Sequence, residues 1–384
     1  MRYVPRQLEP RVLAALRQFP ALVLTGPRRS GKTTMLRRMF PAASYHLLED
    51  PALVGRLRHD PEGFLDDLTL PAVLDEIQNV PELFGHIRAR IDRTPRRTGR
   101  WILTGSQESA LMRGVSESMA GRAAVLQLWP LATTESARVS LLRGGYPEVV
   151  ARPRAASLWF SSYVQTYLER DVRSVLAVHD LATFRRFMAL VASRHGQILN
   201  KTDLSSPLGM SVPGISKWLD VLEATQQILI VPPYFENVGK RLVKSPRLYI
   251  ADSGLACHLL GIESDAELLR SPFAGAVFEG MVASEIVKAQ ANAGRRRELY
   301  FFRDHQGLEV DFVVPSAGAL LLIEAKATRT PRAAMGSAIA ELTLALKGKG
   351  PVRGYVVHRG SPGGIQTLAP SIRAVALSEL LAVI

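Results

Sequence analysis

The amino-acid sequence predicts a mixed α/β protein in which two α/β segments flank a largely helical one. Residues 21–150 alternate short apolar runs with amphipathic stretches (ALVLT, TMLRRMF, LPAVLDEI, RWILTGS), which is typical of a parallel sheet with crossover helices. Residues 155–225 repeat apolar positions at helical spacing. Strand-like runs return in LEVDFVV, ALLLIEAKA and VRGYVVH. We therefore divide the chain into residues 1–150, 151–265 and 266–384.

Composition places the chain among ordinary globular proteins. It has 384 residues, of which 47% are hydrophobic and 22% charged, so bulk disorder is excluded. Its single cysteine, Cys257, excludes an intrachain disulfide and a cysteine-based zinc site, and the eight histidines show no metal-ligand spacing. No apolar run approaches the roughly 18 residues of a membrane span, and no signal peptide is evident at the N-terminus. We expect a cytoplasmic protein with no membrane partner.

The net charge indicates a polyanionic partner. Lys and Arg number 48 against 35 Asp and Glu, which gives +13 at pH 7, and the excess is spread over all three segments. Such a balance favours nucleic acid ahead of a membrane surface. A genomic bias towards arginine produces the same excess, so the charge alone does not decide.

The strongest motif is GPRRSGKT, a complete G-x-x-x-x-G-K-[ST] loop between an apolar strand and a helix. Its glycines let backbone N–H groups face phosphate oxygens, and the N-terminus of the next helix adds partial positive charge. We expect Lys32 to reach the β- and γ-phosphates of ATP and Thr33 to ligate Mg²⁺. The alternative is a chance glycine-rich turn. The predicted nucleotide-binding residues of this loop are Gly26, Pro27, Arg28, Arg29, Ser30, Gly31, Lys32, Thr33 and Thr34.

Two acids close a second apolar strand, LPAVLDE. We expect Asp75 to hold the water shell of Mg²⁺ and Glu76 to polarise the attacking water, although an isolated Asp-Glu pair is often only a solvated loop. A third strand, RWILTGSQ, ends in Thr104, Ser106 and Gln107, which are candidates to sense the γ-phosphate or to orient water. The alternative there is an ordinary polar strand exit. Together the motifs predict hydrolysis as well as binding.

Arg122 precedes the apolar run AAVLQLWPL. An arginine there can neutralise transition-state charge across a subunit boundary, although as a single residue it is more typical of a surface position.

A family resemblance covers nearly the whole chain. GPRRSGKTT, AVLDEIQNV, WILTGSQ, MAGRAAVLQLWPL and GGYPEVV, in this order, resemble prokaryotic AAA-type P-loop ATPases whose C-terminal half is domain of unknown function 4143. The likeness continues through YVQTYLERDV and KSPRLYIADSGLACHLLGI. The resemblance implies an AAA-type ATPase fold for residues 1–150. It also implies that Arg122 acts on the nucleotide of a neighbouring subunit, and therefore a homo-oligomer such as a ring.

Residues 198–231 predict a winged helix-turn-helix. A short helix through Leu204 would turn at Gly209, Ser211 would cap the next helix, and Trp218, Leu219 and Leu222 would be buried. A hairpin over residues 228–249 follows, with basic residues Lys240, Arg241 and Lys244 near its tip, which suits a phosphate backbone. Many such modules only pack against neighbouring domains, so DNA contact and packing remain alternatives.

The last segment contains a possible metal site. Asp311 lies in the strand EVDFVV, and Glu324 and Lys326, two apart, share a face of the next strand. Two carboxylates can hold Mg²⁺ while a lysine positions a nucleophile, as phosphodiester hydrolysis requires. Glu279, on the preceding helix, is a further candidate ligand. The alternative is an exposed ion pair between Glu324 and Lys326.

This pattern resembles the restriction-endonuclease-like superfamily, and Glu279 matches the helix acid of archaeal junction resolvases. The resemblance implies a nuclease-like fold and branched DNA as a candidate substrate. Our preferred hypothesis is an oligomeric, DNA-dependent ATPase that binds and remodels DNA, branched DNA included. The alternatives are an ATP-gated, metal-dependent nuclease and a nucleotide-dependent switch with a protein partner.

Overall fold

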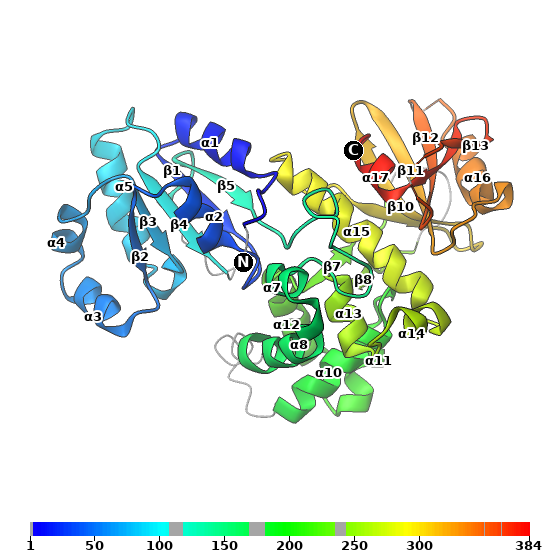
Figure 1. Cartoon of the computed structure of the whole chain (residues 1–384), viewed down its shortest axis with the longest axis horizontal. Helices are drawn as coiled ribbons and strands as arrows, with labels where there is room; N and C mark the ends of the chain where they lie inside the picture. The colour runs from blue at the N-terminus through cyan, green and yellow to red at the C-terminus, as the bar shows by residue number, and fades with distance from the viewer. Residues whose placement is uncertain (1–2, 107–117, 169–180, 235–242, 349, 362) are drawn as a thin grey trace. The chain divides into compact units, whose positions relative to one another are not determined.

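The computed structural model describes residues 3–106, 118–168, 181–234, 243–348, 350–361 and 363–384, which form two units (Figure 1). The first unit comprises Met1–Leu131 together with Ala224–Gln226 and Ala291–Arg295. The second comprises Ala132–Glu223, Gln227–Gln290 and Arg296–Ile384. The division into three segments at residues 150 and 265 stays a prediction.

The first unit is built on a five-stranded sheet in the order β2-β3-β4-β1-β5, with every neighbouring pair parallel. The apolar runs of the sequence analysis form β1, β3, β4 and β5, whereas the partly exposed β2 was not predicted. Only β1, β3 and β4 are buried along their whole length. The strands are β1 (Ala21–Thr25), β2 (Ser44–Leu47), β3 (Ala72–Asp75), β4 (Trp101–Gly105) and β5 (Ala123–Gln127).

Helices cover both faces of this sheet. Alternate residues of β1 point to opposite sides, so Leu22 and Leu24 join one apolar cluster and Ala21 and Val23 the other. The first cluster includes side chains of α1 and α2, and the second includes side chains of α3, α4 and α5. The helices are α1 (Glu9–Gln18), α2 (Lys32–Met39), α3 (Pro51–His59), α4 (Pro61–Asp66) and α5 (Leu83–Arg93).

The second unit begins with helices around a buried aromatic core. Trp218, Leu219 and Leu222 lie in this core, as the apolar spacing predicted. Gly209 adopts a left-handed φ of 62° at the turn between two helices, and the Ser211 hydroxyl accepts a hydrogen bond from the Gly214 N–H at 3.2 Å. The helices are α7 (Pro147–Ala151), α8 (Ala156–Tyr163), the π-helical η3 (Val164–Leu168), α10 (Leu181–Ser193), α11 (Lys201–Ser205) and α12 (Val212–Ala224).

A three-stranded antiparallel sheet, β6-β8-β7, completes this part. The order α11, α12, β7, β8 agrees with the predicted helix-turn-helix and hairpin, whereas β6 was not predicted. The hairpin tip with Lys240 and Arg241 lies outside the described residues, whereas Lys244 is described and exposed. The strands are β6 (Gln197–Ile198), β7 (Ile228–Val231) and β8 (Arg247–Ile250), and the helices that follow are α13 (Ser253–Leu259), α14 (Asp265–Arg270) and α15 (Ala274–Asn292).

A six-stranded mixed sheet follows, in the order β13-β14-β12-β11-β10-β9. The predicted strands EVDFVV and LLLIEAK pair as an antiparallel hairpin, and α16 packs on them through Ile339 and Leu342. The elements are β9 (Tyr300–Arg303), β10 (Glu309–Ser316), β11 (Ala319–Lys326), α16 (Ser337–Ala345), β12 (Val352–His358), β13 (Gln366–Ala369), β14 (Ile372–Ala376) and α17 (Leu377–Leu381).

The predicted fold class is confirmed as a mixed α/β protein, with an N-terminal parallel sheet of the P-loop type followed by helical and sheet segments. Among the described residues, no helix combines the length and apolar character that crossing a membrane requires.

Candidate functional site

The candidate nucleotide site lies at the carboxyl edge of the N-terminal sheet. In the order β3-β4-β1 these parallel strands end side by side, so the residues after each strand meet at one edge. The loop of residues 26–31 follows β1, Asp75 and Glu76 end β3, and Ser106 follows β4. The three motifs predicted from separate stretches of sequence are thereby brought together.

The backbone of the loop is shaped to enclose a phosphate. Gly26 has φ 153° and Gly31 has φ 101°, and Arg29 is left-handed at 63°. A Cβ on Gly26 would lie 2.2 Å from the Leu128 carbonyl oxygen, so no larger residue fits. The Lys32 ammonium, almost fully buried, donates to the Gly26 carbonyl at 2.8 Å and the Pro27 carbonyl at 3.1 Å. The lysine is therefore held against the concave side of its own loop.

The other loop residues have distinct surroundings. Arg28 forms a 3.2 Å ion pair with Glu49, whereas Thr34 is exposed on the first turn of α2. The Ser30 hydroxyl is buried and finds no hydrogen-bond partner among the described residues. The Ser30 carbonyl accepts from Arg6, a buried arginine that also donates to the Trp129 carbonyl at 2.7 Å. Arg6 thus ties the N-terminal segment to the loop.

Asp75 collects three hydroxyl groups at the end of β3. Its Oδ2 accepts from the Thr33 hydroxyl at 2.6 Å and from the phenol of Tyr45 on β2, and its Oδ1 accepts from Thr104. Burial, followed by the hydrogen bond to Asp75, raises the pKa of Tyr45 well above its ordinary value. The donor set of a carboxylate and hydroxyls fits Mg²⁺, which prefers oxygen ligands.

Glu76 is fixed in a conformation that glutamate rarely adopts. Its φ is 59°, and such a left-handed residue persists only where its surroundings hold it. Its Oε2 accepts from the Ser106 hydroxyl at 2.8 Å, from the Ser106 N–H at 3.3 Å and from the Gln78 amide. The sequence analysis predicted that Ser106 contacts the nucleotide. In this structure its hydroxyl and its N–H both donate to Glu76. Gln107 lies outside the described residues.

Arg122 stands away from its own nucleotide loop. It precedes β5 at the end where Ala21 opens the adjacent β1, whereas the loop follows the opposite end of β1. Its guanidinium makes two contacts with Asp92, at 2.6 and 3.0 Å, and is partly exposed. Its action on a neighbouring subunit stays a prediction.

A second cluster of charged groups lies in the other unit. Asp311 on β10 accepts a 2.9 Å hydrogen bond from the Ala325 N–H, and Lys326 pairs with Glu324 on β11 at 2.6 Å. Glu279 reaches the same region from α15, since the Asp311 charge acts on both glutamates. The structure therefore gathers all four residues that the sequence pattern suggested.

The cluster also contains Arg247, which the sequence analysis did not select. Its buried guanidinium lies 2.7 Å from Glu279 and 3.4 Å from Asp311, and it bonds to Glu309. Burial raises the pKa values of Glu279 and Glu324, and the nearby Asp311 charge raises them further. Throughout the ranges that the structure describes, no group of three or more His, Cys, Asp or Glu side chains is arranged to hold a metal ion.

Tyr45 and Arg247, which the sequence analysis did not select, differ in whether a sequence signal could have found them. Tyr45 has no such signal, because its place beside Asp75 follows only from the register in which Tyr45 pairs with Val73. Arg247 has one, since it is a charged residue at the head of the otherwise apolar strand RLYI, where an unpaired charge is costly.

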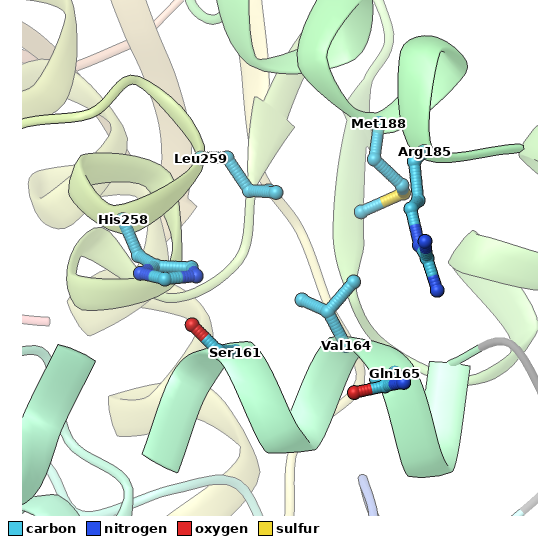
Figure 2. Close-up of a pocket in the computed structure, with 7 residues that line it drawn as sticks. All are labelled: Ser161, Val164, Gln165, Arg185, Met188, His258 and Leu259. Carbon is cyan, nitrogen blue, oxygen red and sulfur yellow. The ribbon is translucent and has the colours of Figure 1, made fainter. Parts of the chain in front are cut away.

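A separate pocket of about 270 Å³ lies between α8, η3, α10 and α13 (Figure 2). Its lining includes the polar side chains of Arg185 and His258 and the apolar side chains of Met188 and Leu259. His258 stacks on Phe160, and burial lowers the pKa of its imidazole. None of the sequence patterns predicted this pocket.

Comparison with known proteins agrees with the geometry of the nucleotide site. Three family models match the chain: an AAA domain over residues 18–137, a domain of unknown function (DUF8612) over 134–266, and a domain of unknown function (DUF4143) over 274–363. The uncharacterized proteins Mb2031c of Mycobacterium bovis and Rv2008c of Mycobacterium tuberculosis are 35% identical over 351 residues, which cover 88% of this chain and 78% of each relative. This chain belongs to their family.

This chain therefore combines an AAA domain with a C-terminal DUF4143 domain, as the sequence motifs predicted. Residues 18–137 form a P-loop ATPase domain of the AAA type. Among solved structures, the Walker-type ATPase PABY2304 of Pyrococcus abyssi is similar, with 17% identity, a TM-score of 0.48 and coverage of 67% of this chain and 96% of that one. The restriction-endonuclease-like nature of the DUF4143 domain stays a prediction.

Proposed function

We propose that this AAA-type ATPase is an oligomeric, DNA-dependent enzyme that hydrolyses ATP to bind and remodel DNA, branched DNA included. The observation that carries the hydrolysis part of the proposal is the geometry at the sheet edge. There the Thr33 hydroxyl lies 2.6 Å from Asp75 Oδ2, and the Ser106 hydroxyl holds the Glu76 carboxylate. A site that only binds nucleotide needs the contact between Thr33 and Asp75 but not a fixed Glu76. A glutamate fixed in a left-handed conformation beside it serves hydrolysis.

Each residue of the site has a role that its contacts support. Lys32 exchanges its two loop carbonyls for the β- and γ-phosphate oxygens when ATP enters. Thr33 and Asp75 are the residues to hold Mg²⁺, which when bound neutralises charge on the phosphates. Glu76 accepts a proton from the attacking water, and Ser106 keeps its carboxylate in place.

DNA is proposed as the partner because of charge and exposure. The chain carries a net charge of +13. The first turn of α12 leaves Ser211, Val212 and Pro213 exposed, together with Lys217 one turn later. In helix-turn-helix modules the N-terminal part of the second helix contacts the bases.

An oligomer is proposed because Arg122 lies at the opposite end of the sheet from its own loop. Only a second subunit can bring this arginine to a nucleotide, where it would stabilise transition-state charge.

The test is ATP hydrolysis by the full chain without DNA and with duplex, single-stranded or four-way-junction DNA, at two salt concentrations. We expect stimulation that is largest with the junction and persists at matched salt, and no turnover by Lys32→Ala. Non-specific charge attraction alone would vanish as salt rises. Lys217→Glu should reduce the stimulation, whereas Lys347→Glu, an equal charge change at an exposed position off α12, should not.

Two results would contradict the proposal. Turnover that is indifferent to every DNA would favour a nucleotide-dependent switch with a protein partner. DNA cleavage that Glu324→Ala abolishes would favour the ATP-gated nuclease.

A further inference from the structure

The charged cluster of the second unit is centred on an arginine. Arg247 opens β8 in the winged-helix sheet, and its side chain is only 4% exposed. One guanidinium nitrogen, Nη1, contacts Glu279 at 2.7 Å and Asp311 at 3.4 Å, and the other, Nη2, bonds to Glu309. The ring of Phe301 lies beneath the guanidinium, 5.0 Å from its central carbon.

These contacts use the oxygens that a metal would need. Glu279 and Asp311 are two of the three predicted metal ligands, and both face the guanidinium. Arginine stays protonated in proteins, so it cannot give up its charge to make room for a divalent cation. A metal ion placed among the same oxygens would meet a positive charge at close range in a buried site. The residues present therefore do not fit a resident metal.

The third predicted ligand is occupied in a different way. Glu324 pairs through Oε1 with Lys326 at 2.6 Å, and its Oε2 is buried with no hydrogen-bond partner among the described residues. Arg247 Nε is also buried with no hydrogen-bond partner among the described residues. The network is thus not fully hydrogen-bonded, as expected where acids face a cation with a fixed planar fork in place of a spherical ion.

We propose that Arg247 is the resident cation of this cluster, taking the place of a divalent metal and closing the carboxylates of Glu279 and Asp311 to metal ions. The arginine also links β8 of the winged helix to α15 and β10, so the two parts of the unit are held together by the same contacts. This inference is independent of ATP hydrolysis.

The test measures Mn²⁺ binding by the full chain without nucleotide. Binding is detected as a decrease in the electron paramagnetic resonance signal of free Mn²⁺. All proteins carry Asp75→Asn, which removes the metal ligand of the nucleotide site. The variants are Arg247→Met, Arg247→Lys and the control Arg303→Met, each with and without Asp311→Asn. Arg303 also pairs with Glu309, at 3.1 Å, but it is 43% exposed and does not contact Asp311 among the described contacts.

We expect Arg247→Met to bind one Mn²⁺ at least about tenfold more tightly than the parent, and Asp311→Asn to abolish the gain. Arg303→Met should bind as the parent does. Mn²⁺ should also raise the melting temperature of Arg247→Met and leave that of the parent unchanged. If Arg247→Met does not fold, Arg247→Lys replaces it, since a buried lysine can lose its proton where an arginine cannot; a smaller gain is then expected.

Two results would overturn the proposal. In one, the parent already binds Mn²⁺ at a site that Asp311→Asn removes, so that arginine and metal coexist. In the other, a folded Arg247 variant gains no Mn²⁺ site.

Discussion

Replacing Ser106 with alanine tests whether this serine orients the proposed catalytic glutamate, Glu76, or contacts the nucleotide. The Ser106 hydroxyl donates to Glu76 Oε2 at 2.8 Å, while the Ser106 N–H and the Gln78 amide donate to the same oxygen. Ser106→Ala removes one donor of three and leaves the backbone contact intact. We therefore expect the Glu76 carboxylate to be oriented less precisely, with little change in the other contacts of the site.

The magnitude follows from the kind of bond that is lost. A hydrogen bond to a charged group contributes about 1.5–3 kcal/mol, and the two remaining donors place this case at the lower end. A loss of about 1.5 kcal/mol in the transition state corresponds to roughly a tenfold fall in kcat. Because the proposed role of Glu76 is to act on water and not on ATP, the KM for ATP should change little.

The assay is steady-state ATP hydrolysis by Ser106→Ala, with kcat and KM measured separately. Ser44→Ala is the matched control, since the hydroxyl of Ser44, at the start of β2, donates to the Thr69 carbonyl and to no other group among the described residues. A raised KM with an unchanged kcat would refute the reasoning. Ser106 would then contact the nucleotide, as the sequence pattern alone suggested.

Three further predictions test other parts of the structure. Tyr45→Phe should lower the Mg²⁺ concentration for half-maximal hydrolysis several-fold, because the phenol competes with the metal for Asp75 Oδ2; an unchanged Mg²⁺ dependence would contradict this. Trp218→Ala should cost about 3–5 kcal/mol in denaturant unfolding, since its ring packs on two phenylalanines at 5.0 and 5.4 Å; the adjacent Lys217→Ala should cost little. Burial raises the pKa of Cys257 to about 12, so a thiol reagent at pH 8 should label it only after unfolding, and native labelling should accelerate as the pH rises; equal rates with and without denaturant would be decisive against it.

Local patterns in the sequence were sufficient for the nucleotide site and for much of the fold. The loop from Gly26 to Thr33 and the acids after β3 are recognisable because strand, turn and helix are contiguous in the chain. Parallel strands then bring their carboxyl ends together without further information. The winged helix was predictable for the same reason, since Gly209 and the cap at Ser211 are local signals.

The tertiary structure decided which side chains lie in contact with the residues of these motifs. Tyr45 lies beside Asp75 only because β2 pairs with β3, and Ser106 lies on Glu76 only because β4 runs between β3 and β1. Arg247 is 64 residues from Asp311 in the chain, and their contact depends on how β8 and β10 pack. The spacing of apolar residues shows which face of a helix or strand is apolar, but not which other element packs against that face. The sequence therefore determined the acids of the C-terminal cluster, and packing alone determined that an arginine lies among them.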